Sequence, residues 1–198
     1  MKTKLLCLAA ALALAGCQNG PLETPPPVGH PVQPPAHTAG PPAQVVTAGP
    51  LTAAGVGPYM DKLERELRTR LRGSGIGVAR RGDDMLLSLP DAHLFAGESL
   101  SPSGQSLLGG AALALRIYDH TLIQVNGYTD TSGSPVQNLS VSLDRANLVG
   151  AALTGDGIAA ERIEAHGFGE TNLKIATGDH VNEPRNRRIE IRIVPRPG

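Results

Sequence analysis

From residue 58 onward, apolar positions recur with the spacing of helices and strands. Leu63, Leu67 and Leu71 recur every four residues and therefore share one helix face. Gly73 ends that run. Two later apolar runs each begin with a serine followed by proline, at Ser101-Pro102 and at Ser134-Pro135. A Ser-Pro pair is typical of a helix N-terminus, with serine as the cap residue and proline at the first helical position. The pattern predicts three helices, over residues 58–72, 101–118 and 136–153.

Shorter apolar runs outside these helices are typical of β-strands. They cover residues 76–80, 85–89, 121–125, 162–166 and 188–194. The first two flank Arg81-Gly82-Asp83-Asp84, whose Gly and Asp suit a hairpin turn, so the Arg-Gly-Asp triplet is interpreted as a turn and not as an integrin-binding motif. The later strands alternate with single helices, which implies crossover connections and a partly parallel sheet. The expected fold is a two-layer α/β (α+β) sandwich, with helices covering a mixed sheet.

The N-terminus has the pattern of an export signal. Lys2 and Lys4 precede an uncharged apolar run over residues 5–15, which is too short to span a bilayer. The run ends at Leu14-Ala15-Gly16-Cys17, which resembles the bacterial lipobox. That resemblance implies that Cys17 is acylated and becomes the new N-terminus, and Gln18 after it favours the outer membrane. The alternative is an ordinary secretory signal with a chance cysteine.

Residues 18–57 have the composition of a tether. Ten of the chain's 17 prolines lie there, and Glu23 is the only charged residue. Such a segment cannot bury enough apolar surface to fold. The expected organisation is a signal peptide over residues 1–16, an acylated linker over 17–57 and one domain over 58–198.

The composition of the remaining chain excludes several classes of function. Without Lys2 and Lys4, 16 basic residues stand against 18 acidic ones, and a net charge of −2 argues against nucleic-acid binding. Cys17 is then the only cysteine, so no disulfide is expected, and the few aromatic residues weigh against carbohydrate binding by ring stacking. No motif of a catalytic nucleophile is present. Four histidines lack metal-ligand spacing, so no metal, cofactor or enzymatic activity is expected: His93, His120, His166 and His180.

Several short motifs occur in a fixed order in the second half of the chain. They are the loop over residues 127–134, the helix positions Asn138, Val141, Ser142, Arg145 and Ala146, the stretch over 167–170, and the stretch over 186–190. Together they resemble the OmpA C-terminal domain family, which binds peptidoglycan, over residues 58–195. With the lipobox, the chain is most similar to the YiaD-type lipoproteins of that family. Tyr128 replaces the family's usual His, and Leu173 replaces a common Pro.

The resemblance assigns the central roles to Asp130 and Arg145. In this family the Asp and the Arg hold diaminopimelate, whose ammonium suits a carboxylate and whose carboxylate suits a guanidinium. Asp130 follows a strand and precedes a helix, where backbone N–H groups favour anions. The alternative is a structural salt bridge between Asp130 and Arg145 that needs no ligand.

Five further residues are expected at or near the same site. Asn138 is expected to contact the ligand because its amide both donates and accepts hydrogen bonds. Thr129 and Leu139 are expected as secondary contacts. One of Arg187 and Arg188 is expected to reach the ligand while the other pairs with Glu190 or Glu170; simple solvation at the sheet edge is the alternative.

These expectations describe a protein that binds peptidoglycan without catalysis and tethers the outer membrane to the cell wall. A periplasmic hydrolase is the enzymatic rival, and the sequence offers little for it. The second alternative is an interaction lipoprotein of a secretion, efflux or Tol–Pal type envelope complex, with the helix over residues 59–72 as the contact surface.

Overall fold

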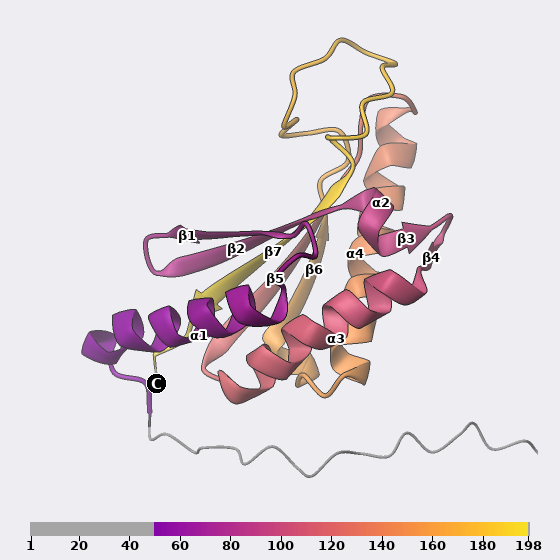
Figure 1. Cartoon of the computed structure of the whole chain (residues 1–198). Coiled ribbons are helices and arrows are strands. Elements are labelled where there is room, and N and C mark those ends of the chain that lie inside the picture. The colour runs from indigo at the N-terminus through magenta and orange to yellow at the C-terminus, as the bar shows by residue number, and fades with distance from the viewer. Residues whose placement is uncertain (1–49, 198) are drawn as a thin grey trace, which may run out of the picture. The chain divides into compact units, whose positions relative to one another are not determined.

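The computed structural model describes residues 50–197. The signal peptide, Cys17 and the linker up to residue 49 lie outside the described residues, so the predictions made for them stay predictions. The description below therefore concerns the folded domain alone (Figure 1).

The domain is built on a five-stranded sheet with the order β1-β2-β7-β5-β6. Its strands are β1 Gly77–Arg81, β2 Asp84–Pro90, β5 Thr121–Tyr128, β6 Ile163–Gly167 and β7 Arg188–Pro195. Strands β5 and β6 are parallel, and every other neighbouring pair is antiparallel. The expected mixed, partly parallel sheet is confirmed, although its parallel part is this one pair.

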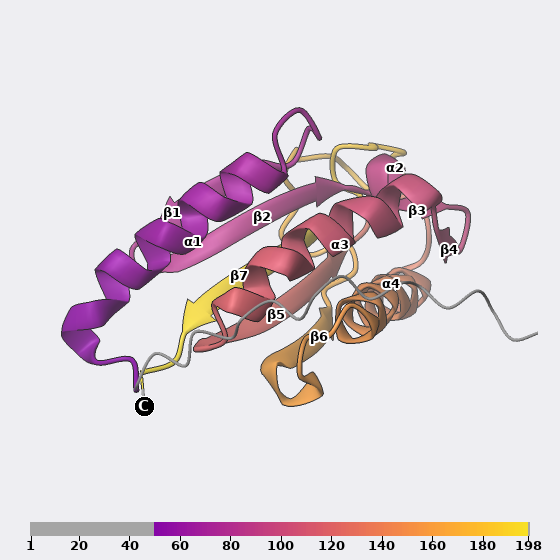
Figure 2. The ribbon, with the colours of Figure 1, turned by 60° about the horizontal axis from the view of Figure 1, so that its bottom comes forward.

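Three long helices cover one face of the sheet, as Figure 2 shows most clearly. They are α1 Val56–Arg70, α3 Pro102–Ile117 and α4 Pro135–Gly155. The Ser101 side chain caps α3, and Ser134 forms a capping box with Gln137 at the start of α4. The two-layer arrangement expected from the sequence is therefore confirmed, with helix starts at the two Ser-Pro pairs.

Small elements absent from the sequence prediction connect β2 to α3. They are α2 Asp91–Leu94 and the two-stranded ribbon of β3 Phe95–Ala96 and β4 Ser99–Leu100; single-turn 3-10 helices lie at Ala53–Gly55 and Ala160–Arg162. These elements are too short to show the periodic spacing of apolar residues that identifies a helix or a strand in a sequence. Gly104 permits the close packing here, because a Cβ atom on it would lie 2.2 Å from the Leu94 carbonyl oxygen.

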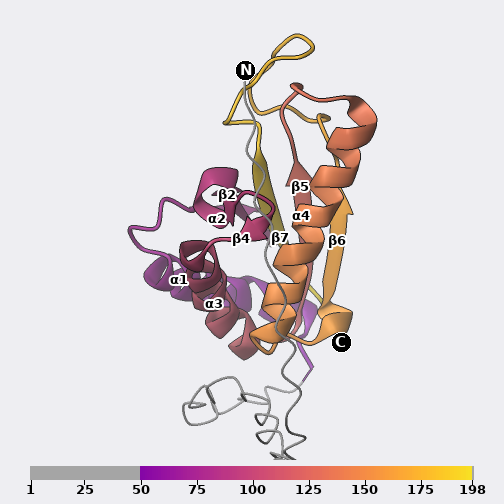
Figure 3. The same ribbon diagram turned by 90° about the vertical axis from the view of Figure 1, so that its right-hand side faces the viewer.

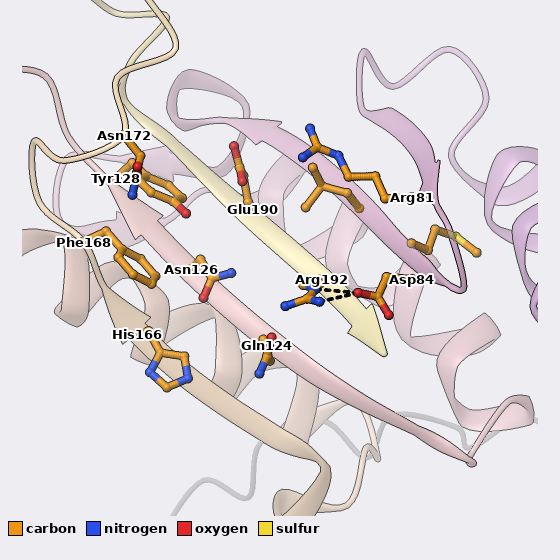
Figure 4. Close-up of a pocket in the computed structure, with 12 residues that line it drawn as sticks. Arg81, Asp84, Gln124, Asn126, Tyr128, His166, Phe168, Asn172, Glu190 and Arg192 are labelled. Carbon is orange, nitrogen blue, oxygen red and sulfur yellow. Dashed lines mark hydrogen bonds and ion pairs between the residues drawn. The ribbon is translucent and has the colours of Figure 1, made fainter. Parts of the chain in front are cut away.

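Alternation along the strands separates an apolar face from a polar one. Met85, Leu87 and Leu89 of β2 are buried under the helices, as are Ile189, Ile191 and Ile193 of β7. The intervening residues of β5 and β7 point to the opposite face, which no helix covers. That uncovered face carries Gln124, Asn126, Glu190 and Arg192 (Figure 4).

The folded part begins before residue 58, the boundary expected from the sequence. Leu51 is 8% exposed and Val56 is 6% exposed, and both belong to the hydrophobic core. Both residues fall within the linker predicted from the sequence, because their neighbours are mainly proline, glycine and alanine. Helix α1 begins at Val56, so Pro58 lies in its first turn, where a missing N–H leaves no intrahelical hydrogen bond broken.

One buried arginine ties the end of α3 to the sheet. The Arg162 guanidinium donates to the backbone oxygens of Leu115, Tyr118 and Thr121, each at 3.0 Å, and to Thr121 Oγ1 at 2.7 Å. Burial lowers the pKa of Arg162, although nearby Tyr59 and Asp119 oppose that shift. The Leu115 and Tyr118 carbonyl groups lie at the end of α3, where a helix leaves such groups without an intrahelical partner.

Candidate functional site

The candidate site lies at one end of the sheet, where four chain segments meet. Strand β7 is antiparallel to both β2 and β5, so its first residue, Arg188, lies beside the last residues of both, Pro90 and Tyr128. The loops after β5 and before β7 therefore approach each other at this end, beside the start of α4 (Figure 3). We call this region the rim site, formed by Asp91, Asp130, Asn138, Arg145 and Arg187.

Asp130 is the most heavily bonded side chain of the rim site. It is 2% exposed. Oδ1 accepts from the Ser132 backbone N–H at 3.1 Å and from Ser132 Oγ at 2.6 Å. Oδ2 accepts from the Glu183 backbone N–H at 3.2 Å and from Arg187 Nη1 at 2.5 Å. These four donors occupy the acceptor capacity of a carboxylate.

The protonation of Asp130 follows from these contacts. Burial alone would raise its pKa, but hydrogen bonds from Ser132 and Arg187 and the positive charge of Arg187 outweigh it, so the pKa is lowered. Asp130 therefore carries a negative charge at neutral pH. It joins its own loop to the loop before β7.

Arg145 pairs with Asp91, a residue that the sequence analysis did not select. Its Nη1 atom lies 3.0 Å from Asp91 Oδ1, and its guanidinium carbon lies 5.3 Å from the Phe95 ring centre. Within the described part of the chain, Asp130 and Arg145 form no ion pair with each other. The alternative of a structural Asp130–Arg145 salt bridge is therefore wrong, since Arg187 and Asp91 hold the two residues separately.

Asp91 is the site residue that sequence reasoning missed. It begins the unexpected helix α2, and its backbone N–H donates to the Arg187 carbonyl oxygen at 3.1 Å. Burial raises its pKa, while Arg145 and Arg187 lower it and Asp130 raises it further. The Asp91–Arg187 backbone hydrogen bond joins the two ion pairs, and each pair influences the pKa of Asp91. An acidic residue directly after a strand was the only sequence signal for it.

Asn138 supports the loop that carries Asp130. Its Nδ2 atom donates to the Asp130 backbone oxygen at 3.1 Å and to Glu170 Oε2 at 2.7 Å. Thr129 is 4% exposed, and its hydroxyl has no hydrogen-bond partner among residues 50–197. Leu139 is instead 53% exposed on α4. The structure thus places Asn138 and Thr129 within the rim and Leu139 on its outer surface.

The two neighbouring arginines take different positions. Arg187 bonds Asp130 and also Asn182 Oδ1, the latter at 2.6 Å, and its side chain is 30% exposed. Arg188 is buried and donates to Glu190 Oε1 at 2.7 Å, and its guanidinium carbon lies 3.9 Å from the Tyr128 ring centre. The expected pairing of one arginine with Glu190 is therefore confirmed for Arg188. Arg187 is the one that faces the rim.

A second set of hydrogen bonds holds the long loop before β7 in place. Thr131 Oγ1 bonds the backbone oxygen of Gly178 at 2.7 Å and accepts from the Val181 N–H at 3.1 Å. Asn186 exchanges two hydrogen bonds with the backbone of Ile175, at 2.8 and 2.9 Å. The loop that supplies Arg187 is thus bound to Thr131 near its middle and cross-linked internally between Ile175 and Asn186.

The described residues offer no metal-binding group and no membrane span. Among residues 50–197, three or more His, Cys, Asp or Glu side chains nowhere gather in a way that could hold a metal ion. No helix in that same range is both long and apolar enough to cross a membrane.

Residues 95–187 match the OmpA family model, which includes most of the rim site but not Asp91. This part of the chain belongs to the OmpA family. The family expected from the motifs is therefore confirmed.

Two relatives show what the chain resembles. It is 38% identical over 143 residues to the Escherichia coli (strain K12) protein named Probable lipoprotein YiaD, covering 71% of this chain and 65% of that one. It is 33% identical over 95 residues to the Peptidoglycan-binding protein ArfA of Mycobacterium bovis, covering 48% of this chain and 29% of ArfA. The chain thus spans less than two thirds of either relative. Neither name describes an enzyme.

A solved structure of similar fold is the cell wall anchor of the T6SS from Pseudomonas aeruginosa. It is 26% identical, with a TM-score of 0.57, and the match covers 67% of this chain and 96% of that one. The similarity extends beyond the residues that match the family model, because it covers two thirds of the chain.

Proposed function

We propose that the rim site binds the diaminopimelate of the peptidoglycan stem peptide without catalysis. The observation that carries this proposal is the cluster of two carboxylates and two guanidiniums, Asp91 with Arg145 and Asp130 with Arg187. Diaminopimelate carries both ammonium and carboxylate groups, so a site with both charges can pair with each of them. The names of ArfA and of the Pseudomonas aeruginosa cell wall anchor support the same ligand class.

The two carboxylates differ in how readily they can accept an ammonium. Asp130 already has four donors, so a ligand reaches its Oδ2 atom only by replacing Arg187. Asp91 forms one side-chain ion pair among the described residues, with Arg145, and retains acceptor capacity. The ligand's ammonium is therefore expected to bind between Asp91 and Asp130, with its carboxylate on Arg145. Arg187, at 30% exposure, is expected to turn outward toward a second carboxylate when the ligand replaces its bond to Asp130.

The remaining predicted contacts surround this position. The unpartnered hydroxyl of Thr129 is a donor that a bound carboxylate or peptide carbonyl would satisfy. Asn138 holds the Asp130 loop through the Asp130 backbone oxygen. Exposed Leu139 offers apolar contact beside the rim. Arg188 does not contact the ligand in this arrangement but packs against the Tyr128 ring and so supports the start of the loop that carries Asp130.

The test is a titration of the full chain with a muropeptide that contains diaminopimelate and with one that contains lysine. Lysine lacks the second carboxylate, so we expect weaker binding. Arg145→Met removes the guanidinium but retains a long side chain against Phe95. A charge-assisted hydrogen bond contributes ~1.5–3 kcal/mol, so affinity should fall roughly 10- to 150-fold. Arg116→Met, on an exposed residue of α3, is the matched control. Equal affinity for both peptides, or unchanged binding by Arg145→Met, would contradict the assignment.

We further propose that acylated Cys17 anchors the chain to the outer membrane, so that the domain faces the periplasm and tethers membrane to wall. The lipobox-like residues before Cys17 and the lipoprotein name of the Escherichia coli relative support this. In fractionated cells, Cys17→Ser should move the chain from the outer membrane to the soluble periplasm. Retention of the variant in the membrane would place the anchor elsewhere. A role in an envelope complex stays an alternative, which a pulldown from envelope extracts would test.

A further inference from the structure

The uncovered face of the sheet contains a groove that the rim site does not use (Figure 4). Its volume is about 640 Å³. Its lining includes side chains from β5, β6 and β7, together with Phe168 directly after β6: Gln124, Asn126, Tyr128, His166, Phe168 and Glu190. We call it the open-face groove. It is separated from the helix-covered core by the sheet itself.

Aromatic rings form one end of the open-face groove. Tyr128 and Phe168 stack with ring centres 5.2 Å apart and planes 13° from parallel. Tyr128 is buried against the Arg188 guanidinium, whereas Phe168 is half-buried and so presents ring surface to the groove. His166 lies beside it, with ring centres 6.4 Å apart. The chain has only three Tyr and two Phe, which weighed against carbohydrate binding by ring stacking in the sequence, but the fold brings two of these five rings together at this groove.

The charges that line the open-face groove are largely neutralised within it. Glu190 is bonded by Arg188, and Asp84 by the Nε atom of Arg192, each at 2.7 Å. Gln124 donates to Glu164 at 3.0 Å. Such paired groups have little attraction for a strongly charged ligand, because binding it would require breaking an ion pair. Arg81, at the β1 edge, lines the groove without an ion pair among the described residues; the rest of the groove therefore suits a neutral ligand with many hydroxyl or amide groups.

Asn126 provides hydrogen-bonding capacity at the centre of the groove. It is half-buried, and its side-chain amide has no hydrogen-bond partner among residues 50–197. A free amide donates and accepts at once, which matches the acetamido and hydroxyl groups of an amino sugar. A partly exposed ring beside such an amide supplies the apolar surface that the flat face of a sugar ring needs.

We propose that the open-face groove binds a neutral oligosaccharide of N-acetylated amino sugars, the glycan strand of peptidoglycan. This inference rests on the proposed function of the rim site, because one peptidoglycan unit would bind both. Tyr128 and Asp130 are two residues apart, which is at most about 7 Å of extended chain. A stem peptide of a few residues, at about 3.3–3.6 Å each, is long enough to reach from a sugar at Tyr128 to the rim.

The experiment is an NMR titration of the full chain with a tetrasaccharide of N-acetylglucosamine, which is neutral, whereas peptide-free N-acetylmuramic acid would carry a free lactyl carboxylate. We expect saturable shifts at Asn126, His166 and Phe168. Asn126→Ala should weaken binding roughly 2- to 10-fold, as the loss of one or two neutral hydrogen bonds implies. Asn147→Ala, an exposed amide on α4, is the matched control and should bind as the wild type does. Phe168→Leu tests the ring surface separately while retaining an apolar side chain.

Asp130→Asn separates this inference from the proposed function. It should weaken binding of the diaminopimelate peptide and leave tetrasaccharide binding unchanged. Absence of shifts in the groove at millimolar tetrasaccharide would overturn the inference, as would equal affinity of the wild type and Asn126→Ala. Shifts that depend on protein concentration and not on tetrasaccharide would assign the groove to a second copy of the chain and would equally overturn it. Loss of peptide binding alone bears only on the rim site.

Discussion

Asp130→Asn should destabilise the domain even when no ligand is present. The substitution removes the negative charge that faces Arg187 and the Glu183 N–H. The asparagine NH2 group is itself a donor, so where it replaces Oδ2 it cannot accept the hydrogen bonds of these two groups. Each charge-assisted bond contributes ~1.5–3 kcal/mol, and partial exposure of Arg187 places the sum near the low end. We therefore expect a loss of about 2–4 kcal/mol in the free energy of unfolding.

The assay is urea denaturation together with thermal unfolding at pH 7. For a domain of this size, each kcal/mol corresponds to about 2–4 °C, so the midpoint should fall by roughly 4–16 °C. Asp144→Asn is the matched control, because Asp144 is exposed and its side chain contacts only Ser140 Oγ, at 3.5 Å, among the described residues. A change below about 0.5 kcal/mol in Asp130→Asn would refute the view that this carboxylate joins the two loops.

The pH dependence of stability provides a second readout of the same contact. The pKa of folded Asp130 is lowered, so its stabilising contribution is complete above the unfolded value of about 3.9. The contribution is lost as pH falls through the lower folded pKa. Wild-type stability should therefore decline over that acidic window by more than that of Asp130→Asn. Parallel declines would show that another group is responsible.

Three further predictions concern Arg162, Gly127 and Asp91. Arg162→Lys should lower the free energy of unfolding by about 2–4 kcal/mol in urea denaturation, because an ammonium cannot reach all four acceptors; Arg116→Lys, on the surface, should change it little. Gly127→Ala should lower it by about 1–3 kcal/mol, since a Cβ atom there would lie 2.1 Å from the Ser142 backbone oxygen, whereas Gly155→Ala meets no atom within 4 Å and should be tolerated. Burial raises the pKa of Asp91. The affinity for the diaminopimelate peptide, measured by calorimetry, should therefore fall on acidification at a higher pH than an ordinary carboxylate would cause, and Asp91→Asn should remove that dependence. An identical pH profile in the variant would contradict the role of Asp91.

The helices and strands were predictable because each long element carries its own periodic signal. Leu63 and Leu67 identified α1, and the Arg81–Asp84 hairpin followed from two apolar runs around glycine. The elements α2, β3 and β4 were not predictable in this way, because four or two residues do not complete a period. Leu51 was missed for a related reason, since a single apolar residue in a Pro-rich stretch has no neighbours that form a pattern.

The members of the site were more predictable than its pairings. Motifs predicted Asp130, Arg145 and Arg187 as site residues, but an ion pair depends on which chain segments meet at the end of the sheet. Asp130 and Arg187 are 57 residues apart, and their contact follows from the antiparallel pairing of β5 with β7. Asp91 reaches Arg145 because β2 pairs with the other side of β7. Neither partner can be chosen without knowing the strand order.

The pairing of charges before any ligand binds has a consequence for affinity. A ligand that takes Asp130 or Arg145 must exchange one set of ion pairs for another, so only the difference between the two sets favours binding. Under the proposed function, a single rim site therefore binds a single stem peptide weakly.

The cell wall repeats that peptide many times, and an acyl anchor would confine the domain close to it. Retention on intact wall should then exceed the affinity measured with a soluble peptide, because confinement raises the effective concentration of ligand. A soluble Cys17→Ser chain should sediment with isolated sacculi as weakly as its peptide affinity implies, while the acylated chain in membrane vesicles should be retained far longer. Equal retention of the two forms would show that the rim site alone accounts for attachment to the wall.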